Sequence, residues 1–420
     1  MCQKCIEVKP LISYKVKHMI NLVKVWRAFT SAPHRMFFFW GSIQSLLTLM
    51  WWMADLAGRF GGFYTPISWA VAPTDAHAFL MIYSFFPFFI FGFLMTTFPR
   101  WMNGEEVERK AYLPAFLLLT AGSILFYVGL IFSLIILKIA YLLFLAGWGL
   151  GLYGLLRVYL RAKHPDKRHA AITGVVLGFG WLLLAGFVSN NAHFITIAKV
   201  GGVWLILLPV FFAVSHRMIP FFSANAIPNY KIVRPNWVLA LIPSFALIHG
   251  ILELIGLQAW TWLVDLPMAI SAIYLTRAWR LRASLAVPIL AMLHIGFAWL
   301  GIALTLYTIQ SLALLFTGQL ILAKAPLHAM AIGYFTSVLI AMGTRVTLGH
   351  SGRMLKADRL TWAIFLAFQT VATLRITSEL PGINLAMRSH LYLCAAAVWL
   401  ICFGVWIYKY APIYWQDRVD

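Results

Sequence analysis

The residues of this chain most able to do chemistry are histidines that lie within long apolar stretches of sequence. An ionisable side chain at membrane depth is costly, so each such position is a candidate functional site. Four of the twelve histidines lie in or beside charged segments and are expected to be solvated, namely His18, His34, His164 and His169. The other eight lie in or at the ends of the apolar stretches, namely His77, His193, His216, His249, His294, His328, His350 and His390.

Imidazole groups at these positions suit a small set of cofactors. Imidazole is the usual protein ligand of haem iron and also binds copper. Two histidines on facing helices can hold one haem from both sides, and histidines on adjacent helices can hold a copper ion. For any single histidine, a hydrogen bond to a neighbouring carbonyl group is the structural alternative.

The elements that must position these histidines are transmembrane helices. Each of twelve apolar stretches is close to the ~20 residues that cross a bilayer. They are residues 36–56, 75–98, 113–133, 139–160, 170–188, 192–215, 237–255, 259–275, 284–307, 326–343, 361–377 and 389–408. The sequence therefore predicts an all-α, polytopic membrane protein of about twelve transmembrane helices.

The lysines and arginines orient these predicted helices, because almost all of them fall in every second gap. Basic residues in short loops mark the cytoplasmic side. Both chain ends are therefore predicted to be cytoplasmic, in a multi-pass protein of a bacterial inner membrane. The few basic residues placed elsewhere are Arg59, Lys138, Lys199, Lys324, Arg375 and Arg388.

This orientation places five histidines in the periplasmic half of the bilayer, namely His77, His193, His249, His328 and His390. His294 is expected near mid-membrane. The second, sixth and tenth predicted helices look alike, because each opens with a histidine and closes with an arginine. That repetition every four helices predicts three parallel four-helix units around an axis normal to the membrane.

The composition agrees with this class. Hydrophobic residues make up 62% of the chain and charged residues 11%, which excludes an ordinary soluble domain. The net charge of +20 follows from the bias toward cytoplasmic basic residues and indicates a lipid partner, with no nucleic acid.

The chain is expected to divide into a basic cytoplasmic segment, residues 1–35, a single transmembrane domain, residues 36–410, and a cytoplasmic tail, residues 411–420. The first segment is expected to lie on the inner leaflet. Two thiols alone cannot complete a tetrahedral metal site, so the role of the Cys2 and Cys5 pair stays open.

Several motifs along the chain resemble those of one bacterial membrane family. They are Ala76–Leu80, Gly92–Trp101, Arg217–Ser223, Leu293–Leu300 and His328–Arg353. At these motifs the chain resembles the NnrS family, whose members are inner-membrane proteins that bind haem and copper and are linked to nitric oxide metabolism and nitrosative stress.

The resemblance implies a metal site near the outer face. His77 and His328 are the candidate axial haem ligands, and His193 and His249 are the candidate copper ligands, with His390 and His294 as further candidates. Arg217, Arg345 and Arg353 are candidates to bind haem propionates, and the alternative is that they only fix the topology.

One motif departs from the family pattern. Family members commonly have His-Ala-His-Glu at the start of the second helix, whereas this chain has Asp75-Ala76-His77-Ala78. Asp75 is expected to cap the helix, and the alternative is that it orients the ring of His77.

Two other functions stay open at this point. A proton-coupled transporter would use the carboxylates Glu253 and Asp265, and an assembly partner of a respiratory complex would bind metal only in passing. Catalysis and an electron donor cannot be read from the residues. Residues 311–324 are expected to form a short segment at the outer face, and a lid over the site is one use for it.

Overall fold

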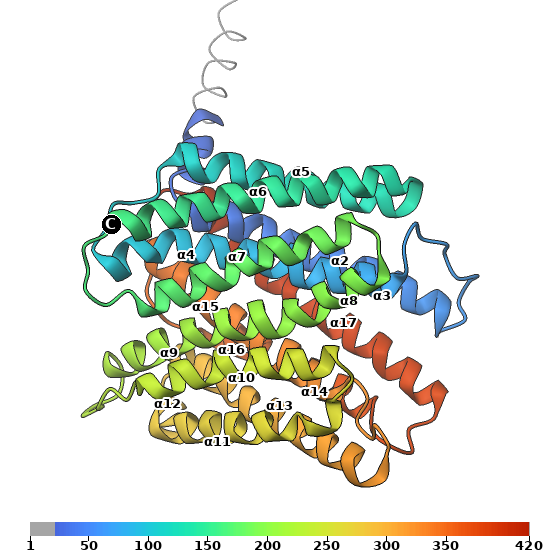
Figure 1. Cartoon of the computed structure of the whole chain (residues 1–420). Coiled ribbons are helices and arrows are strands. Elements are labelled where there is room, and N and C mark those ends of the chain that lie inside the picture. The colour runs from blue at the N-terminus through green and yellow to red at the C-terminus, as the bar shows by residue number, and fades with distance from the viewer. Residues whose placement is uncertain (1–21, 420) are drawn as a thin grey trace, which may run out of the picture.

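The computed structural model describes residues 22–419, and in that range the chain is helical without any strand (Figure 1). Cys2, Cys5, His18 and most of the basic segment 1–35 lie outside the described residues. The longer helices and their bounds are α2 (Pro33–Arg59), α5 (Arg109–Phe132), α6 (Leu134–Arg161), α7 (Arg168–Val188), α10 (Asn236–Leu254), α11 (Trp262–Ala278), α13 (Pro288–Thr317), α16 (Arg359–Thr377) and α17 (Leu385–Tyr410).

Three further long helices are continuous but change type along their length. They are α3–η1–α4 (Pro73–Phe79, Leu80–Phe85, Phe86–Met102), α8–η2–α9 (Ala192–Gly201, Gly202–Leu207, Leu208–Ala224) and α14–η4–α15 (Ala325–His328, Ala329–Thr336, Ser337–His350). We call these three the inner helices, because 89%, 78% and 83% of their most apolar stretches are buried, more than in any other span among the described residues. Short helices η3 (Gln258–Trp260), α12 (Leu281–Ser284) and η5 (Ala411–Trp415) complete the connections.

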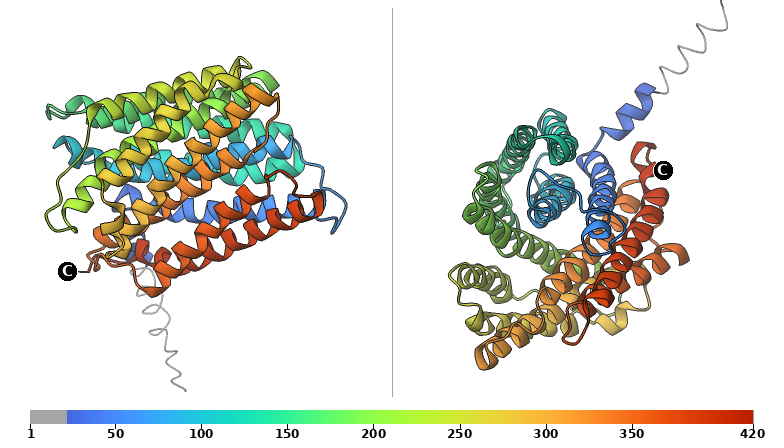
Figure 2. Two further views of the ribbon diagram at one scale, coloured as in Figure 1. Left: turned by 90° about the horizontal axis from the view of Figure 1, so that it is seen from below. Right: turned by 90° about the vertical axis from the view of Figure 1, so that its right-hand side faces the viewer.

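Ten helices of the described chain are long and apolar enough to cross a membrane, which agrees with the predicted polytopic membrane fold. All twelve predicted stretches form helices, and the two outside this group of ten are α2 and α11. Helix α11 has only 17 residues, and α2 buries seven polar or charged side chains, among them Ser42, Gln44, Ser45 and Thr48 in its middle. Both nevertheless run alongside the other helices (Figures 1 and 2).

The remaining helices surround the inner ones in chain order (Figure 2). Helix α17 packs against α2, so the last and first long helices close the ring. The side chain of Arg35, at the start of α2, donates hydrogen bonds to the carbonyl oxygens of Tyr414 (3.3 Å) and Gln416 (2.7 Å). The beginning of α2 and the end of α17 therefore lie at the same end of the bundle, as an even number of antiparallel crossings requires.

The middle segment of each inner helix, η1, η2 and η4, is a π-helix, in which backbone hydrogen bonds span five residues. Close packing accompanies these segments. A Cβ atom on Gly202 of η2 would lie 2.5 Å from Cγ2 of Ile82, and one on Gly333 of η4 would lie 2.5 Å from the Trp299 ring. Glycine at these two places lets helix backbones approach closely, as small residues do in membrane proteins.

The expectation for residues 311–324 is wrong in its first half. Residues 311–317 complete α13, which runs without a helix breaker until Gly318, whose φ of 70° ends it. Only residues 318–324 connect α13 to α14. Helix α15 is also longer than predicted, because it continues to His350 rather than ending at residue 343.

Candidate functional site

His77 lies on α3 at the outer end of the first inner helix, the end predicted to face the periplasm. Its imidazole stacks on the Trp52 ring of α2, with 4.1 Å between ring centroids and 15° between planes. Trp52 also contacts the guanidinium group of Arg59, which lies 5.3 Å from its centroid. The Nδ1 atom of His77 is buried and has no hydrogen-bond partner among the described residues. A buried polar atom without a partner calls for an explanation, and a missing ligand is one.

His328 lies on α14 at the outer end of the third inner helix. Its Nδ1 is 2.9 Å from the carbonyl oxygen of Lys324, and its Nε2 is 3.3 Å from Nη2 of Arg375. Arginine only donates hydrogen bonds, so Nε2 must accept and Nδ1 must carry the proton. The backbone carbonyl thus orients the ring as it commonly does for a metal-bound histidine, and the Nε2 lone pair, which now accepts from Arg375, is the position that a metal would take over.

Arg375, on α16, connects His328 to an acidic and an aromatic neighbour. Its Nη2 donates to Oε1 of Glu379 at 3.1 Å, and its guanidinium lies 4.1 Å from the Tyr392 ring centroid. Arg59 and His77 both contact the Trp52 ring, and Arg375 contacts His328 directly. Two imidazoles and two guanidinium groups therefore share the outer end of the bundle.

We call Trp52, Arg59, His77, His328 and Arg375 the outer site. Its histidines were predicted, but its arginines were not. The available signal was that Arg59 and Arg375 belong to the few basic residues outside the predicted cytoplasmic segments. Each of these cations has a local partner in the structure, since Arg59 pairs with the buried Asp55 and Arg375 with Glu379.

A second polar cluster lies on α10 and α11. Nδ1 of His249 is 2.6 Å from Oδ1 of Asp265, and its Nε2 is 3.7 Å from Oε2 of Glu253. The Trp204 ring stacks on His249 with 3.5 Å between centroids, and its Nε1 donates to Oε2 of Glu253 at 3.1 Å. We call His249, Glu253, Asp265 and Trp204 the carboxylate cluster.

The predicted copper ligands do not come together. His193 and His390 are exposed, His249 belongs to the carboxylate cluster, and the buried His294 lies 2.9 Å from the hydroxyl oxygen of Ser223. In residues 22–419 no group of three His, Cys, Asp or Glu side chains is placed to hold a metal ion. These residues therefore do not fit a copper centre built from three such ligands.

The predicted propionate-binding arginines lie at the opposite end of the bundle from the haem-ligand candidates. Arg345 follows His328 by 17 residues on one continuous helix, which is ~25 Å along its axis. Arg345 lies over the Phe222 ring at 3.8 Å, Arg217 over Trp101 at 4.9 Å, and Arg353 donates to Gln416 at 2.5 Å. One haem cannot reach both ends, so Arg59 and Arg375 replace these three as the candidate anion ligands.

The expectation that His34 and His169 are solvated is wrong, since both are buried. Nε2 of His169 lies 3.1 Å from Nδ1 of His216, and the His34 ring centroid lies 4.7 Å from that of His350. Both pairs lie at the inner end of the bundle. The segments that hold His34 and His169, predicted to be cytoplasmic, are the first turns of α2 and α7, which pack against neighbouring helices.

Asp75 does not cap its helix, because α3 has no side-chain cap. Its Oδ1 instead accepts a hydrogen bond from Nζ of Lys199 at 2.6 Å. The pair joins α3 to α8 and accounts for a lysine inside a predicted span.

Comparison with known proteins agrees with the resemblance seen in the motifs. A search of curated proteins found no match. The family model described as NnrS protein matches residues 28–418, which is nearly the whole chain. Because the match covers all the long helices and both polar clusters, the chain belongs to the NnrS family.

Proposed function

We propose that this NnrS-family protein binds a haem at the outer site and acts in nitric oxide metabolism or in protection against nitrosative stress. The observation that carries the proposal is the place of His77, stacked on the Trp52 ring that Arg59 also contacts, and of His328, which Arg375 contacts, at the outer end of the bundle. The electrostatics and the aromatic surroundings match what a haem requires, namely imidazole ligands, an apolar wall and cations for two propionates.

The residues of the outer site fit that cofactor in three ways. His77 has a buried Nδ1 that lacks a partner, and the Lys324 carbonyl holds His328 with Nε2 as its lone-pair nitrogen. Trp52 supplies a flat aromatic wall against His77. Bound haem would supply an iron atom that could take nitric oxide as a ligand in place of one of the two imidazoles. We include no copper ion, because the predicted copper ligands are dispersed.

We also propose a location for the protein in the cell. Twelve crossings, with α2 and α11 added to the ten helices that are long and apolar enough to span, would put the single domain of residues 36–410 in the bacterial inner membrane. The basic residues then support cytoplasmic chain ends and an outer site in the periplasmic half. An electron donor forms no part of the proposal.

Absorption spectra of the protein purified in mild detergent test this function. We expect a haem Soret band that shifts when nitric oxide is added, and loss of the band in His77→Ala and in His328→Ala. His390→Ala is the matched control, because His390 is exposed and also opens a helix at the outer end. A wild-type protein without haem, or a His77→Ala variant with full haem content, would refute the proposed site.

The carboxylate cluster favours a second candidate function, proton-coupled transport. Its buried His249 lies between Asp265 and Glu253, an arrangement that can hold and pass a proton within the membrane. Flux in reconstituted vesicles under a pH gradient would test it. Transport predicts that Asp265→Asn and Glu253→Gln abolish flux while haem content is unchanged. The assembly-partner alternative stays a prediction.

A further inference from the structure

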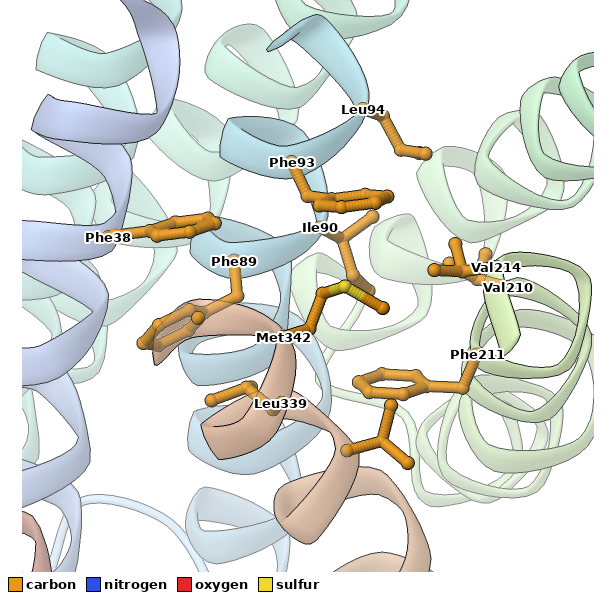
Figure 3. A pocket seen from close by; sticks show the side chains of 12 residues that line it. Phe38, Phe89, Ile90, Phe93, Leu94, Val210, Phe211, Val214, Leu339 and Met342 are labelled. Carbon is orange, nitrogen blue, oxygen red and sulfur yellow. The ribbon is translucent and has the colours of Figure 1, made fainter. Parts of the chain in front are cut away.

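The three inner helices enclose a cavity where they meet. It is lined by Phe89, Ile90, Phe93 and Leu94 of α4, by Val210, Phe211 and Val214 of α9, by Val338, Leu339, Met342 and Gly343 of α15, and by Phe38 of α2. The cavity has a volume of about 40 Å³ and its side chains converge from all three helices (Figure 3). All of these side chains are buried.

The side chains that line this cavity exclude water. Every lining side chain is apolar, and the one glycine is inside a helix whose backbone groups are bonded to each other. A buried water needs two to four polar partners, whereas an apolar cavity stays dry and accepts apolar guests. The space equals roughly three water-sized spheres, which suits a molecule of two heavy atoms and is too small for a haem or a quinone.

The cavity lies directly after the π-helical segments of the three inner helices. In each of them the first lining residue comes shortly after the π-helical segment ends: Phe89 after Phe85, Val210 after Leu207 and Val338 after Thr336. The same local irregularity thus lies on the outer side of the cavity three times. Such irregular turns in membrane and soluble helices are frequent at functional sites.

An aromatic cluster closes the cavity toward the outer site. Phe86, Phe211 and Phe335 come one from each inner helix, and their ring centroids are 5.5, 6.0 and 5.0 Å apart. Phe86 and Phe335 each precede the lining residues of their own helix by three positions. The cavity is therefore separate from the outer site, ~16 Å along the helix from His328 to Leu339.

From these observations we infer that the central cavity is a binding site for a small apolar gas molecule in the middle of the membrane. Apolar diatomic gases dissolve better in hydrocarbon than in water, and the cavity offers them a fixed position among the inner helices. That the natural guest is nitric oxide rests on the proposed function. The existence of the gas site does not rest on that function.

Xenon is the probe, because it is apolar, of similar size and visible by its anomalous scattering in pressurised crystals. Gly343→Ala adds a methyl group to the wall at ordinary contact distance, 3.5 Å from the Trp406 ring and 3.8 Å from the Phe89 ring. Gly404→Ala is the matched control, because a Cβ atom there meets nothing within 4 Å. Val214→Phe fills the cavity.

We expect xenon in the cavity of the wild type and of Gly404→Ala, lower occupancy in Gly343→Ala and none in Val214→Phe. If Val214→Phe does not fold, the difference in xenon occupancy between Gly343→Ala and Gly404→Ala tests the inference. Water or a lipid chain in the wild-type cavity, or full xenon occupancy in Gly343→Ala, would overturn the inference. Haem-free His77→Ala should still bind xenon, so a failure of the haem proposal leaves the gas site standing.

Discussion

At the scale of single residues, Arg375 organises the outer site through three donated hydrogen bonds. It contacts Ser378 Oγ at 2.6 Å, Glu379 Oε1 at 3.1 Å and His328 Nε2 at 3.3 Å. Glu379 is only 7% exposed, so its carboxylate depends on this guanidinium. Arginine is suited to the position because its planar fork can serve several acceptors at once.

Replacing Arg375 should therefore affect both stability and haem content. We expect Arg375→Gln to lower the free energy of unfolding by about 1.5–3 kcal/mol, because the buried carboxylate of Glu379 loses its charged donor and keeps only the hydroxyl of Tyr392. Haem content should fall as the proposed propionate partner is lost. Arg388→Gln is the control, since Arg388 also lies at the outer end but donates to the carbonyl of Ser378. Thermal unfolding and haem absorbance in detergent measure both effects, and equal behaviour of the two variants would contradict this role.

The sequence predicted which histidines lie near the outer face but not which of them face each other. Depth follows from counting residues along a helix, whereas the direction of a side chain turns by about 100° with each residue. His193 and His77 both open inner helices, yet His193 is exposed and His77 stacks on Trp52. A hydrophobic stretch without polar interruption gives no signal for that direction, so the sequence could not show that the predicted copper ligands lie in different surroundings.

At the scale of helices, close packing at glycine should be testable on η4. Gly333→Ala would push a methyl group against Trp299, whose Nε1 is held by Gln369 at 2.8 Å. We expect a loss of about 1–3 kcal/mol in unfolding free energy, as for other overpacked sites. Gly178→Ala should instead be neutral or stabilising, because nothing lies within 4 Å of its Cβ position. Thermal unfolding compares them, and a Gly333→Ala protein as stable as wild type would refute the packing argument.

The start of α16 offers a prediction with a pH dependence. Asp358 accepts a hydrogen bond from the backbone N–H of Thr361 at 2.9 Å and pairs with Lys409. Burial raises the pKa of the Asp358 carboxyl, but hydrogen bonds from Lys409 and Thr361 outweigh it and lower the pKa to about 2. A folded pKa below the ordinary 3.8 means that this contribution is complete above about pH 4 and is lost as the pH falls toward 2.

Two substitutions separate the cap from the ion pair. Asp358→Ala should cost about 1 kcal/mol at pH 7, because both are lost. Asp358→Asn should cost less, since asparagine caps a helix as well as aspartate does. The difference between wild type and Asp358→Asn should shrink between pH 6 and pH 3 in thermal unfolding experiments. A difference that grows on acidification would contradict the assigned ion pair.

All twelve predicted helices are present, because length and hydrophobicity are properties of a whole segment. The π-helical segments were not predicted. The extra residue in such a turn is accommodated by packing, as at Gly202 against Ile82, and packing partners from distant parts of the chain are not visible in a local pattern. The same limit hid the burial of His34 and His169, which lie in charged segments.

At the scale of the whole molecule, the orientation in the membrane can be tested with single cysteines in a background without native ones. Gln319 and Lys163 are both exposed, in connections predicted to lie on opposite sides. We expect a membrane-impermeant thiol reagent to label Gln319→Cys in intact spheroplasts and Lys163→Cys only after lysis. The reverse pattern would invert the bundle and place the outer site on the cytoplasmic side.

The π-helical segments also determine the direction in which side chains point before and after them within each inner helix. Each segment lies between an outer part, which carries a histidine in α3, α8 and α14, and an inner part that lines the cavity. An α-helix advances about 100° per residue, so deleting one residue from η1 would restore regular turns and rotate His77 by that angle relative to Phe89. The imidazole would leave Trp52 while the cavity wall stayed in place. The one extra residue in each π-helical segment thus lets the outer and inner halves of the helix contact different neighbours.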